Sequence, residues 1–399
     1  MARLVGTVSR GIRAPIIREG DDLVSFVSDA VIEASKDSEW GFTIHDRDII
    51  CITEAIVGRA QGNYAYVNQI AKDVKRKTGG GTVGVVFPIL SRNRFAILLR
   101  GIAMGVKKVV IELSYPSDEV GNQLLTQEEV DEKGLNPYTD FLSVEDFRRL
   151  FGKKVHRFTG VDYIDYYKEV VEKAGAECEI IFGNNPAAIK DKVDAAIAAD
   201  IHTANRTKRQ LKEAGIPVVL GLDEILNESV DGSGYNKDFG LLGSNKATED
   251  KVKLFPRDGQ VIVEGIQERI KEATGKTVEV MVYGDGGFKD PLCGIWEFAD
   301  PVVSPFYTKG LEGVPNELKI KFLADNDFKD LSGEDLQSAI KKQIEKKDKD
   351  LVGNMASQGT TPRRLTDLIG SLSDLTSGSG DKGTPIVFIQ GYFDNYSTK

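Results

Sequence analysis

The sequence predicts a mixed α/β protein in which helices and strands alternate, with an inserted α/β region in the middle of the chain. Two observations predict this class. Apolar residues spaced by three and four indicate amphipathic helices, whereas short continuous apolar runs between turn residues indicate buried strands. The two kinds of segment alternate along the 399 residues without a visible internal repeat. The length allows two or three domains of ordinary size.

The first sixty residues predict the order strand, helix, strand. Residues 4–8 form the first strand, and Asp21 or Asp22 can cap the helix that follows. The apolar face of this helix has three- and four-residue spacing and consists of Leu23, Phe26, Val27, Ala30, Val31 and Ala34. Residues 49–53 predict a second, fully apolar strand that contains Cys51, and we expect this cysteine to pack in the core.

The next segment predicts a helix over residues 67–77 and buried strands over residues 82–88 and 108–113. Between the two strands, basic residues interleave with apolar ones, namely Arg92, Arg94 and Arg100. These arginines could neutralise phosphates or carboxylates, or they could form the solvated face of an amphipathic helix, and the sequence leaves both interpretations open. Asp118 follows the second strand, at the edge where open sheets place their ligands.

The middle of the chain predicts a separate α/β region. Residues 123–154 are polar and indicate an insertion or a lid. Helices and strands then alternate: helices are expected over residues 161–175, 189–199 and 208–214, and strands over residues 179–186 and 216–222. The predicted division is therefore 1–122, 123–258 and 259–399, with the first and last segments forming one domain.

The last third contains the most informative turn. A helix over residues 260–274 leads into a buried strand that ends at Tyr283, and glycines surround the next aspartate, Asp285. A carboxylate on such a tight turn can approach a metal ion or a phosphate closely, and Asp290 and Asp300 follow it. The alternative is an ordinary acidic surface turn.

A glycine-rich loop near the C-terminus precedes the last buried strand, over residues 386–391. The loop, residues 376–385, can present several backbone N–H groups to a phosphate, with Lys382 and Asp381 as charge and metal partners. It is not a P-loop, because no Gly-Lys-Ser/Thr sequence leads into a helix.

Composition narrows the function classes. The formal net charge of -9 is spread in mixed runs, which argues against a nucleic-acid partner and favours discrete basic sites for an anionic ligand. Three cysteines far apart predict neither a disulfide framework nor a paired-cysteine zinc site. No apolar run approaches the ~18 residues of a membrane span, so we expect a cytoplasmic protein without a membrane partner. The scattered His45, His156 and His202 are expected to be structural.

The chain resembles the coenzyme F420-0:γ-glutamyl ligase family. The likeness lies in residues 15–23, in residues 46–50 with 60–62, in the strand and turn of residues 280–287, and in the loop of residues 380–385. The resemblance implies the α+β fold of that family, here with an inserted α/β region, and a homodimer. It also implies that GTP or ATP activates a carboxylate as an acyl phosphate, which the amino group of glutamate then attacks.

The resemblance also implies site residues. Arg59 stands where the family usually has a lysine, and Asp285 would act in catalysis and bind metal. Gly286 beside it and Asp118 complete the implied metal positions. The implied nucleotide-binding residues are Ala14, Pro15, Ile16, Ile17, Glu54, Ala55, Asn122, Ser377, Gly378, Ser379, Gly380, Asp381, Lys382, Gly383 and Thr384.

The expected function is therefore a nucleotide-dependent ligase that joins an amino acid, L-glutamate, to a small carboxylate acceptor, F420-0 or an analogue. The implied cofactors are Mg²⁺ or Mn²⁺, with K⁺ as an additional cation. Two alternatives remain open at this point. One is a non-catalytic nucleotide-binding or regulatory protein of the same fold, and the other is a phosphotransferase whose acceptor is a hydroxyl.

Overall fold

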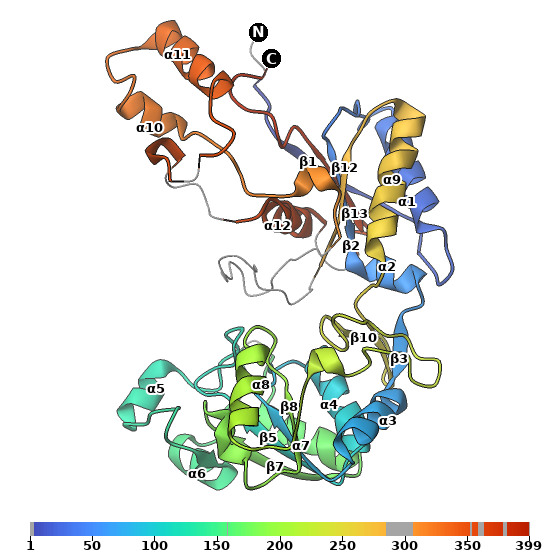
Figure 1. The fold of residues 1–399 in the computed structure, drawn as a ribbon, viewed down its shortest axis with the longest axis vertical. Helices are drawn as coiled ribbons and strands as arrows, with labels where there is room; N and C mark the ends of the chain where they lie inside the picture. Colours follow the sequence, from blue (N-terminus) through green and yellow to red (C-terminus); the bar gives the residue numbers. More distant parts are fainter. Residues whose placement is uncertain are drawn as a thin grey trace.

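A computed structural model describes residues 4–157, 159–284, 306–351, 353–357, 363–377 and 381–398. Helices and mixed sheets are both present, which confirms the predicted α+β class. The described chain forms two lobes (Figure 1). The terminal lobe contains residues 4–62 and the described part of residues 259–398, and the middle lobe contains residues 63–258. In the described part of the chain, no helix is long and apolar enough to cross a membrane.

A four-stranded sheet forms the centre of the terminal lobe. Its order is β1-β13-β2-β12, and only the β2–β12 pair is parallel. The strands are β1 (Val8–Ile12), β13 (Ile386–Gln390), β2 (Ile49–Thr53) and β12 (Glu279–Tyr283). The N-terminal strand was predicted over residues 4–8 and instead begins at Val8, because its pairing with β13 starts there.

Helices cover both faces of this sheet, which explains why β2 is apolar at consecutive positions rather than at alternate ones. On one face, Ile50 and Ile52 pack with α1 (Leu23–Ser35) and α9 (Gly259–Thr274). On the other face, Ile49 and Cys51 pack with α12 (Leu365–Ser377). Cys51 is fully buried, as predicted for a core cysteine.

The middle lobe is built on a six-stranded sheet of order β6-β7-β5-β4-β8-β9, and all neighbours are parallel except β6 and β7. The strands are β4 (Thr82–Val86), β5 (Lys108–Leu113), β6 (Leu142–Ser143), β7 (Glu177–Phe182), β8 (Ala195–Ala198) and β9 (Val218–Gly221). Strands β4 and β5 come from the predicted N-terminal segment, so this sheet spans the predicted boundary at residue 122.

Helices flank the six-stranded sheet on both sides. One face packs with α3 (Val67–Thr78), α4 (Phe95–Met104) and α7 (Tyr163–Lys173), and the other with α8 (Ala204–Glu213). The prediction of a helix over residues 189–199 was wrong. Its alanine-rich end forms β8, because Ala195 and Ile197 fill the core on one face while Ala196 and Ala198 fill the core on the other. A strand buried on both faces loses the alternating pattern that would identify it.

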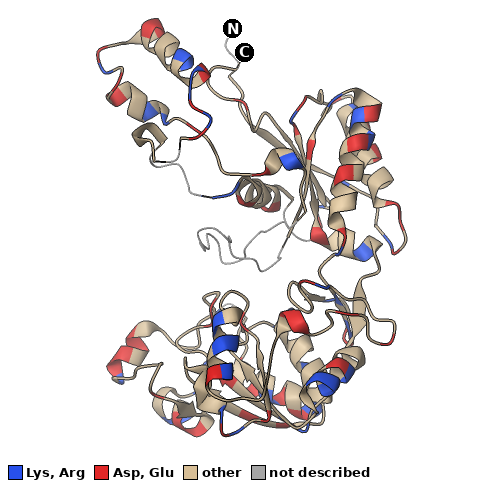
Figure 2. Ribbon diagram, viewed as in Figure 1, with Lys and Arg blue, Asp and Glu red and all other residues tan. Residues whose placement is uncertain are grey.

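Shorter elements complete the chain. The remaining helices of the described chain are α2 (Glu54–Ala60), α5 (Gln127–Glu132), α6 (Val144–Phe151), α10 (Ile320–Asp325) and α11 (Gly333–Glu345). The described residues also form the short 3-10 helices η1 (Pro186–Ile189), η2 (Leu222–Glu224), η3 (Lys309–Leu311) and η4 (Met355–Ser357). Acidic and basic residues are intermixed on the helices of both lobes (Figure 2), as the mixed charge runs of the sequence predict.

A small sheet carries the chain between the lobes. Its order is β10-β11-β3, all antiparallel, and the strands are β3 (Tyr64–Tyr66), β10 (Asn245–Lys246) and β11 (Lys251–Lys253). The chain enters the middle lobe through β3 and leaves it after β11, and these two strands pair directly. A backbone hydrogen bond from Leu254 N to Asn63 O, 2.8 Å long, extends the pairing toward the terminal lobe. The two crossings therefore form one ribbon.

Candidate functional site

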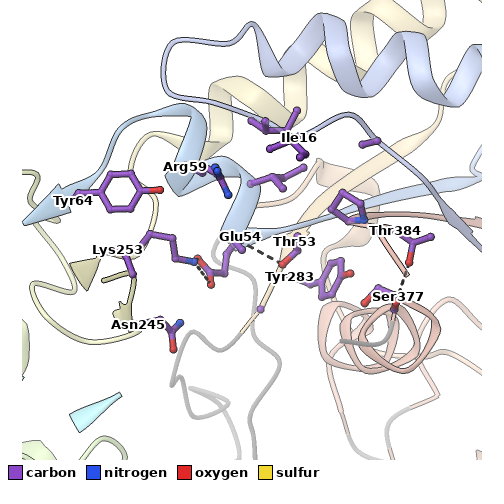
Figure 3. A pocket seen from close by; sticks show the side chains of 18 of the residues that line it. Ile16, Thr53, Glu54, Arg59, Tyr64, Asn245, Lys253, Tyr283, Ser377 and Thr384 are labelled. Atoms are coloured by element: carbon purple, nitrogen blue, oxygen red, sulfur yellow. Dashed lines mark hydrogen bonds and ion pairs between the residues drawn. The ribbon is translucent and has the colours of Figure 1, made fainter. Parts of the chain in front are cut away.

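A cleft of about 980 Å³ lies where the four-stranded sheet of the terminal lobe faces the ribbon of β3, β10 and β11 (Figure 3). Its described walls come from segments far apart in the chain, namely residues 14–17, 53–59, 64, 245–248, 251–253, 283–284, 374–377 and 383–385. The cleft is large enough to enclose a nucleotide-sized ligand.

Strand directions explain why these segments meet. Because β2 and β12 are parallel and Thr53 is paired with Tyr283, both strands end at the same edge of the sheet. Strand β13 runs the other way, so the loop before it reaches the same edge, where Thr53 N donates to Pro385 O at 3.0 Å. Ala14, just beyond the end of β1, donates from its backbone N to Gly383 O at 3.3 Å. One edge of one sheet thus gathers these four segments of the terminal lobe, and the end of α12 adds Asp374 and Ser377.

A buried ion pair closes the inner wall of the cleft. The Lys253 ammonium lies 2.7 Å from Glu54 Oε1 and 2.8 Å from Oε2, and both side chains are almost fully buried. Glu54 is placed at the start of α2, where Thr53 Oγ1 accepts from the Ala55 N–H. Gly284 packs against this carboxylate so closely that a Cβ there would lie 2.3 Å from Glu54 Cγ. Only glycine leaves room for the Glu54 side chain.

The described walls of the cleft carry an excess of positive charge. Their cations are Arg59, Lys246, Lys251 and Lys253, against the two carboxylates of Glu54 and Asp374. Lys251 Nζ lies 4.2 Å from the centroid of the Tyr64 ring, a cation–π contact that holds the ammonium at the wall. In a protein of net charge -9, such a local excess suits an anionic ligand such as a polyphosphate.

Tyr283 and Ser377 form the floor beside the ion pair (Figure 3). Tyr283 is buried, and burial raises the pKa of its phenol although the nearby Ser377 hydroxyl opposes the shift. Its hydroxyl meets no group of the described chain in hydrogen-bond geometry. Thr384 Oγ1 donates to Ser377 O at 2.9 Å and so ties the end of α12 to the loop before β13. A neutral phenol donor therefore lines the cleft next to the buried cation.

The cleft brings together many of the residues that the sequence singled out. Those that line it are Ala14, Pro15, Ile16, Ile17, Glu54, Ala55, Arg59, Ser377, Gly383 and Thr384. Asp381 and Lys382 are exposed and are not among its lining residues. Seven predicted positions lie outside the described residues, namely Asp285, Gly286, Asp290, Asp300, Gly378, Ser379 and Gly380.

Asp118 and Asn122 lie elsewhere, at the carboxyl end of β5 in the middle lobe, and do not line the cleft. Asp118 is buried and accepts hydrogen bonds of 2.8 Å from the backbone N–H of Leu90 and from both the backbone N–H and the side-chain amide of Asn122. These bonds hold two loops together at the end of the sheet. A role for Asp118 in metal binding stays a prediction.

Sequence reasoning missed the contribution of the ribbon, which supplies Tyr64, Lys246, Lys251 and Lys253. The sequence carries only a weak signal for these residues. Lys251 and Lys253 are two residues apart and therefore project from the same face of a strand, but the strand has only three residues. Tyr283 was placed in a buried strand, and its position as the last residue of β12, at the sheet edge beside Thr53, brings it to the cleft.

The described residues contain no group of three or more His, Cys, Asp or Glu side chains arranged to hold a metal ion. Within the cleft, the carboxylates that the described chain offers are Glu54 and Asp374, and Lys253 engages both oxygens of the first. These two positions do not by themselves make a metal site.

Comparisons with known proteins agree with the geometry. A search of the curated proteins finds no match. The model of the F420-0:gamma-glutamyl ligase family matches residues 11–391, which include every segment of the cleft and the whole middle lobe. Because this match covers nearly the whole chain, the protein belongs to the F420-0:γ-glutamyl ligase family.

Proposed function

We propose that the protein is a nucleotide- and divalent-metal-dependent ligase that joins L-glutamate to a small carboxylate acceptor, F420-0 or an analogue, through an acyl phosphate. The observation that carries the proposal is the cationic cleft at the sheet edge, with Lys253 fixed on Glu54 at its inner wall. Family membership supplies the reaction class, the formation of a C–N bond by a γ-glutamyl ligase.

The reaction has two steps. A carboxylate oxygen of the acceptor attacks the terminal phosphorus of the nucleoside triphosphate, which forms the acyl phosphate and releases the diphosphate. The glutamate nitrogen then attacks the acyl carbon, the C–O bond to phosphate breaks, and the amine loses a proton as the amide forms. Both steps need positive charge beside the phosphoryl oxygens and the exclusion of water from the acyl phosphate.

The described residues suit these needs in distinct ways. Lys253 is held by Glu54 and offers its ammonium from a fixed place, while Arg59 presents an exposed guanidinium that can bind phosphate with two donors. Ile16 is 78% exposed at the rim of the cleft, so its apolar side chain is available to cover a nucleobase. The Tyr283 phenol, whose pKa is raised, stays protonated and can donate to a phosphoryl or carbonyl oxygen.

The metal dependence rests on the family resemblance, with Asp285 as the proposed ligand outside the described residues. A bound divalent cation would neutralise charge on the phosphates. The proposal extends to GTP or ATP as the nucleotide, to K⁺ as an additional cation, and to a cytoplasmic homodimer. Size-exclusion chromatography with light scattering checks the dimer directly.

The test is an incubation with GTP or ATP, Mg²⁺ or Mn²⁺, F420-0 and single amino acids, with phosphate release and product mass measured together. We expect phosphate release that requires both F420-0 and glutamate, and a product heavier by one or more glutamyl residues. Nucleotide binding without turnover would instead indicate a regulatory protein, and a stable phosphorylated product would indicate a phosphotransferase. The variant Asp285→Asn should lose most activity with an unchanged melting temperature.

A further inference from the structure

A second hollow, of about 290 Å³, lies in the middle lobe between α4, α7 and the turn that joins β10 to β11. Polar side chains dominate its walls, namely Arg92, Arg100, Tyr166, Lys173, Lys246 and Glu249. Four of these six are cations and one is an acid. We call this hollow the arginine pocket. The pocket contains Arg92 and Arg100, for which the sequence left two interpretations open: anion binding, or the solvated face of a helix.

Among the cations of the pocket, the two arginines are those whose positive charge is not paired with an acid in the described chain. Lys173 pairs with Glu169, and Lys246 pairs with Glu249. In contrast, neither Arg92 nor Arg100 meets a carboxylate anywhere in the described part of the chain. Arg100 Nη1 instead donates to the backbone carbonyl of Glu249 at 2.7 Å, a bond that holds the guanidinium against the pocket wall. Two guanidinium groups left facing one hollow repel each other, and an anion between them would remove that repulsion.

The arginine pocket is next to the cleft. Lys246 lines both of them, so the two spaces adjoin at this residue. Its backbone N donates to Asn93 O at 2.9 Å and so fixes β10 to the loop that carries Arg92. A ligand with its reacting group in the cleft can therefore extend past Lys246 and place a second group in the pocket.

We propose that the arginine pocket binds an anionic group of the acceptor, a carboxylate or a phosphate, while the reacting carboxylate of the same acceptor lies in the cleft. This assignment rests on the proposed ligase function and adds a subsite that selects polyanionic acceptors. Arg92 and Arg100 supply forked donors that suit both kinds of anion, and Lys246 contacts the ligand where it passes from one space to the other.

The first test is kinetic. The double variant Arg92→Gln/Arg100→Gln is compared with Arg209→Gln/Lys212→Gln, which removes the same charge from α8, a helix that contributes nothing to either space. We expect KM for the acceptor to rise at least about tenfold in the first variant, because two charge-assisted hydrogen bonds are lost. KM for the nucleotide and kcat should stay within about twofold of wild type in both variants, since the cleft keeps its own cations.

The second test needs no ligase activity. Tripolyphosphate and citrate are titrated into wild type and both double variants by isothermal calorimetry, as a phosphate probe and a carboxylate probe. Weaker binding of either probe in the arginine variant alone supports the pocket, and the probe that is affected more identifies the preferred group. The inference is overturned if the probes bind equally well to both double variants, or if both variants weaken binding by the same factor. The loss of any two positive charges on the surface would then explain the result.

The two tests separate the inference from the proposed function. If wild type forms amide but the arginine variant shows unchanged acceptor KM and unchanged probe binding, the subsite is wrong and the ligase stands. If wild type forms no amide, the acceptor role is overturned together with the proposed function, whatever the probes show. Circular dichroism spectra and melting temperatures of both double variants check that each variant is folded, so that both tests compare folded proteins.

Discussion

Lys253 Nζ binds both carboxylate oxygens of Glu54, at 2.7 and 2.8 Å, although the two residues are 199 positions apart in the chain. Glu54 begins α2 in the terminal lobe, and Lys253 ends β11 on the ribbon. The side chains are only 6% and 11% exposed, so the pair is largely removed from water. It joins the two lobes at the wall of the cleft.

Breaking this pair should destabilise the protein strongly. In Lys253→Met, the Glu54 carboxylate stays buried without that ammonium, which typically costs about 3–5 kcal/mol. We expect a lower free energy of unfolding by urea and no glutamate-dependent phosphate release. The double variant Glu54→Gln/Lys253→Met should recover much of the stability, because no buried charge remains, while activity stays lost. Full activity of the double variant would show that the pair has no role in the reaction.

Arg59 should matter for activity and not for stability. It is exposed, and in the described chain no carboxylate pairs with its guanidinium. Arg59→Ala should therefore change the free energy of unfolding by no more than about 0.5 kcal/mol. It should raise KM for the nucleotide about tenfold, since a charge-assisted contact to phosphate is lost. Arg59→Lys should recover part of this loss. The control Lys36→Ala removes a charge from the exposed end of α1, and steady-state kinetics should show no change.

Gly284 should not tolerate alanine. The added methyl group would lie 2.3 Å from Glu54 Cγ, so either the carboxylate or the end of β12 must move. We expect Gly284→Ala to lose about 1–3 kcal/mol of stability and most activity, because the overpacked site displaces the ion pair. Gly6→Ala is the matched control, since a Cβ there meets nothing within 4 Å. Melting curves and activity for both variants are the measurements, and wild-type behaviour of Gly284→Ala would contradict the packing described above.

The middle lobe should lose stability as pH rises. Burial, together with the neighbouring Asp200 and Asp118, raises the pKa of Glu119 from 4.5 to about 7, although the backbone N–H groups of Ile201 and His202 oppose the shift. The folded state thus holds this proton more strongly than the unfolded chain. The resulting stability is fully present below pH 4.5 and is lost as pH rises through 7.

Replacing this carboxyl group tests the pH effect. Glu119→Gln should flatten the difference in unfolding free energy between pH 5 and pH 8 by an amount on the order of 3 kcal/mol. Urea denaturation of wild type and variant at both pH values measures it. The pKa values of Asp118 and Asp200 are also raised by burial, so some dependence of the same sign should persist in the variant. If the difference in unfolding free energy between pH 5 and pH 8 is the same in Glu119→Gln as in wild type, the group that causes the pH dependence is not Glu119.

Much of the terminal lobe could be predicted from the sequence because its signals are local. The spacing of apolar residues predicts α1, and the apolar runs predict β2 and β13 within a residue or two. The strand β8 could not be predicted, because alanines favour a helix and the packing on both faces that makes it a strand comes from distant segments. The order of the sheets likewise depends on contacts that no local pattern contains.

The residues of the cleft likewise divide into those that the sequence indicates and those that only the structure identifies. Ala14 to Ile17, Glu54 and Arg59 were indicated by the family resemblance, and the pairing of both β1 and β2 with β13 explains why they lie together. Lys253 carries no such signal. Its role depends on a short strand that returns from the middle lobe and on a partner in another lobe, so only the three-dimensional arrangement identifies it.

The ribbon of β3 and β11 determines how the lobes can move. In the described part of the chain, the polypeptide passes between the lobes through this adjoining pair of strands, so a rotation of one lobe against the other would pivot there. Lys253 lies on the pivot and is displaced least when the lobes rotate. In the proposed ligase, a phosphate group held at Lys253 would therefore keep its place during such a rotation, because Lys253 is fixed to Glu54 of the other lobe.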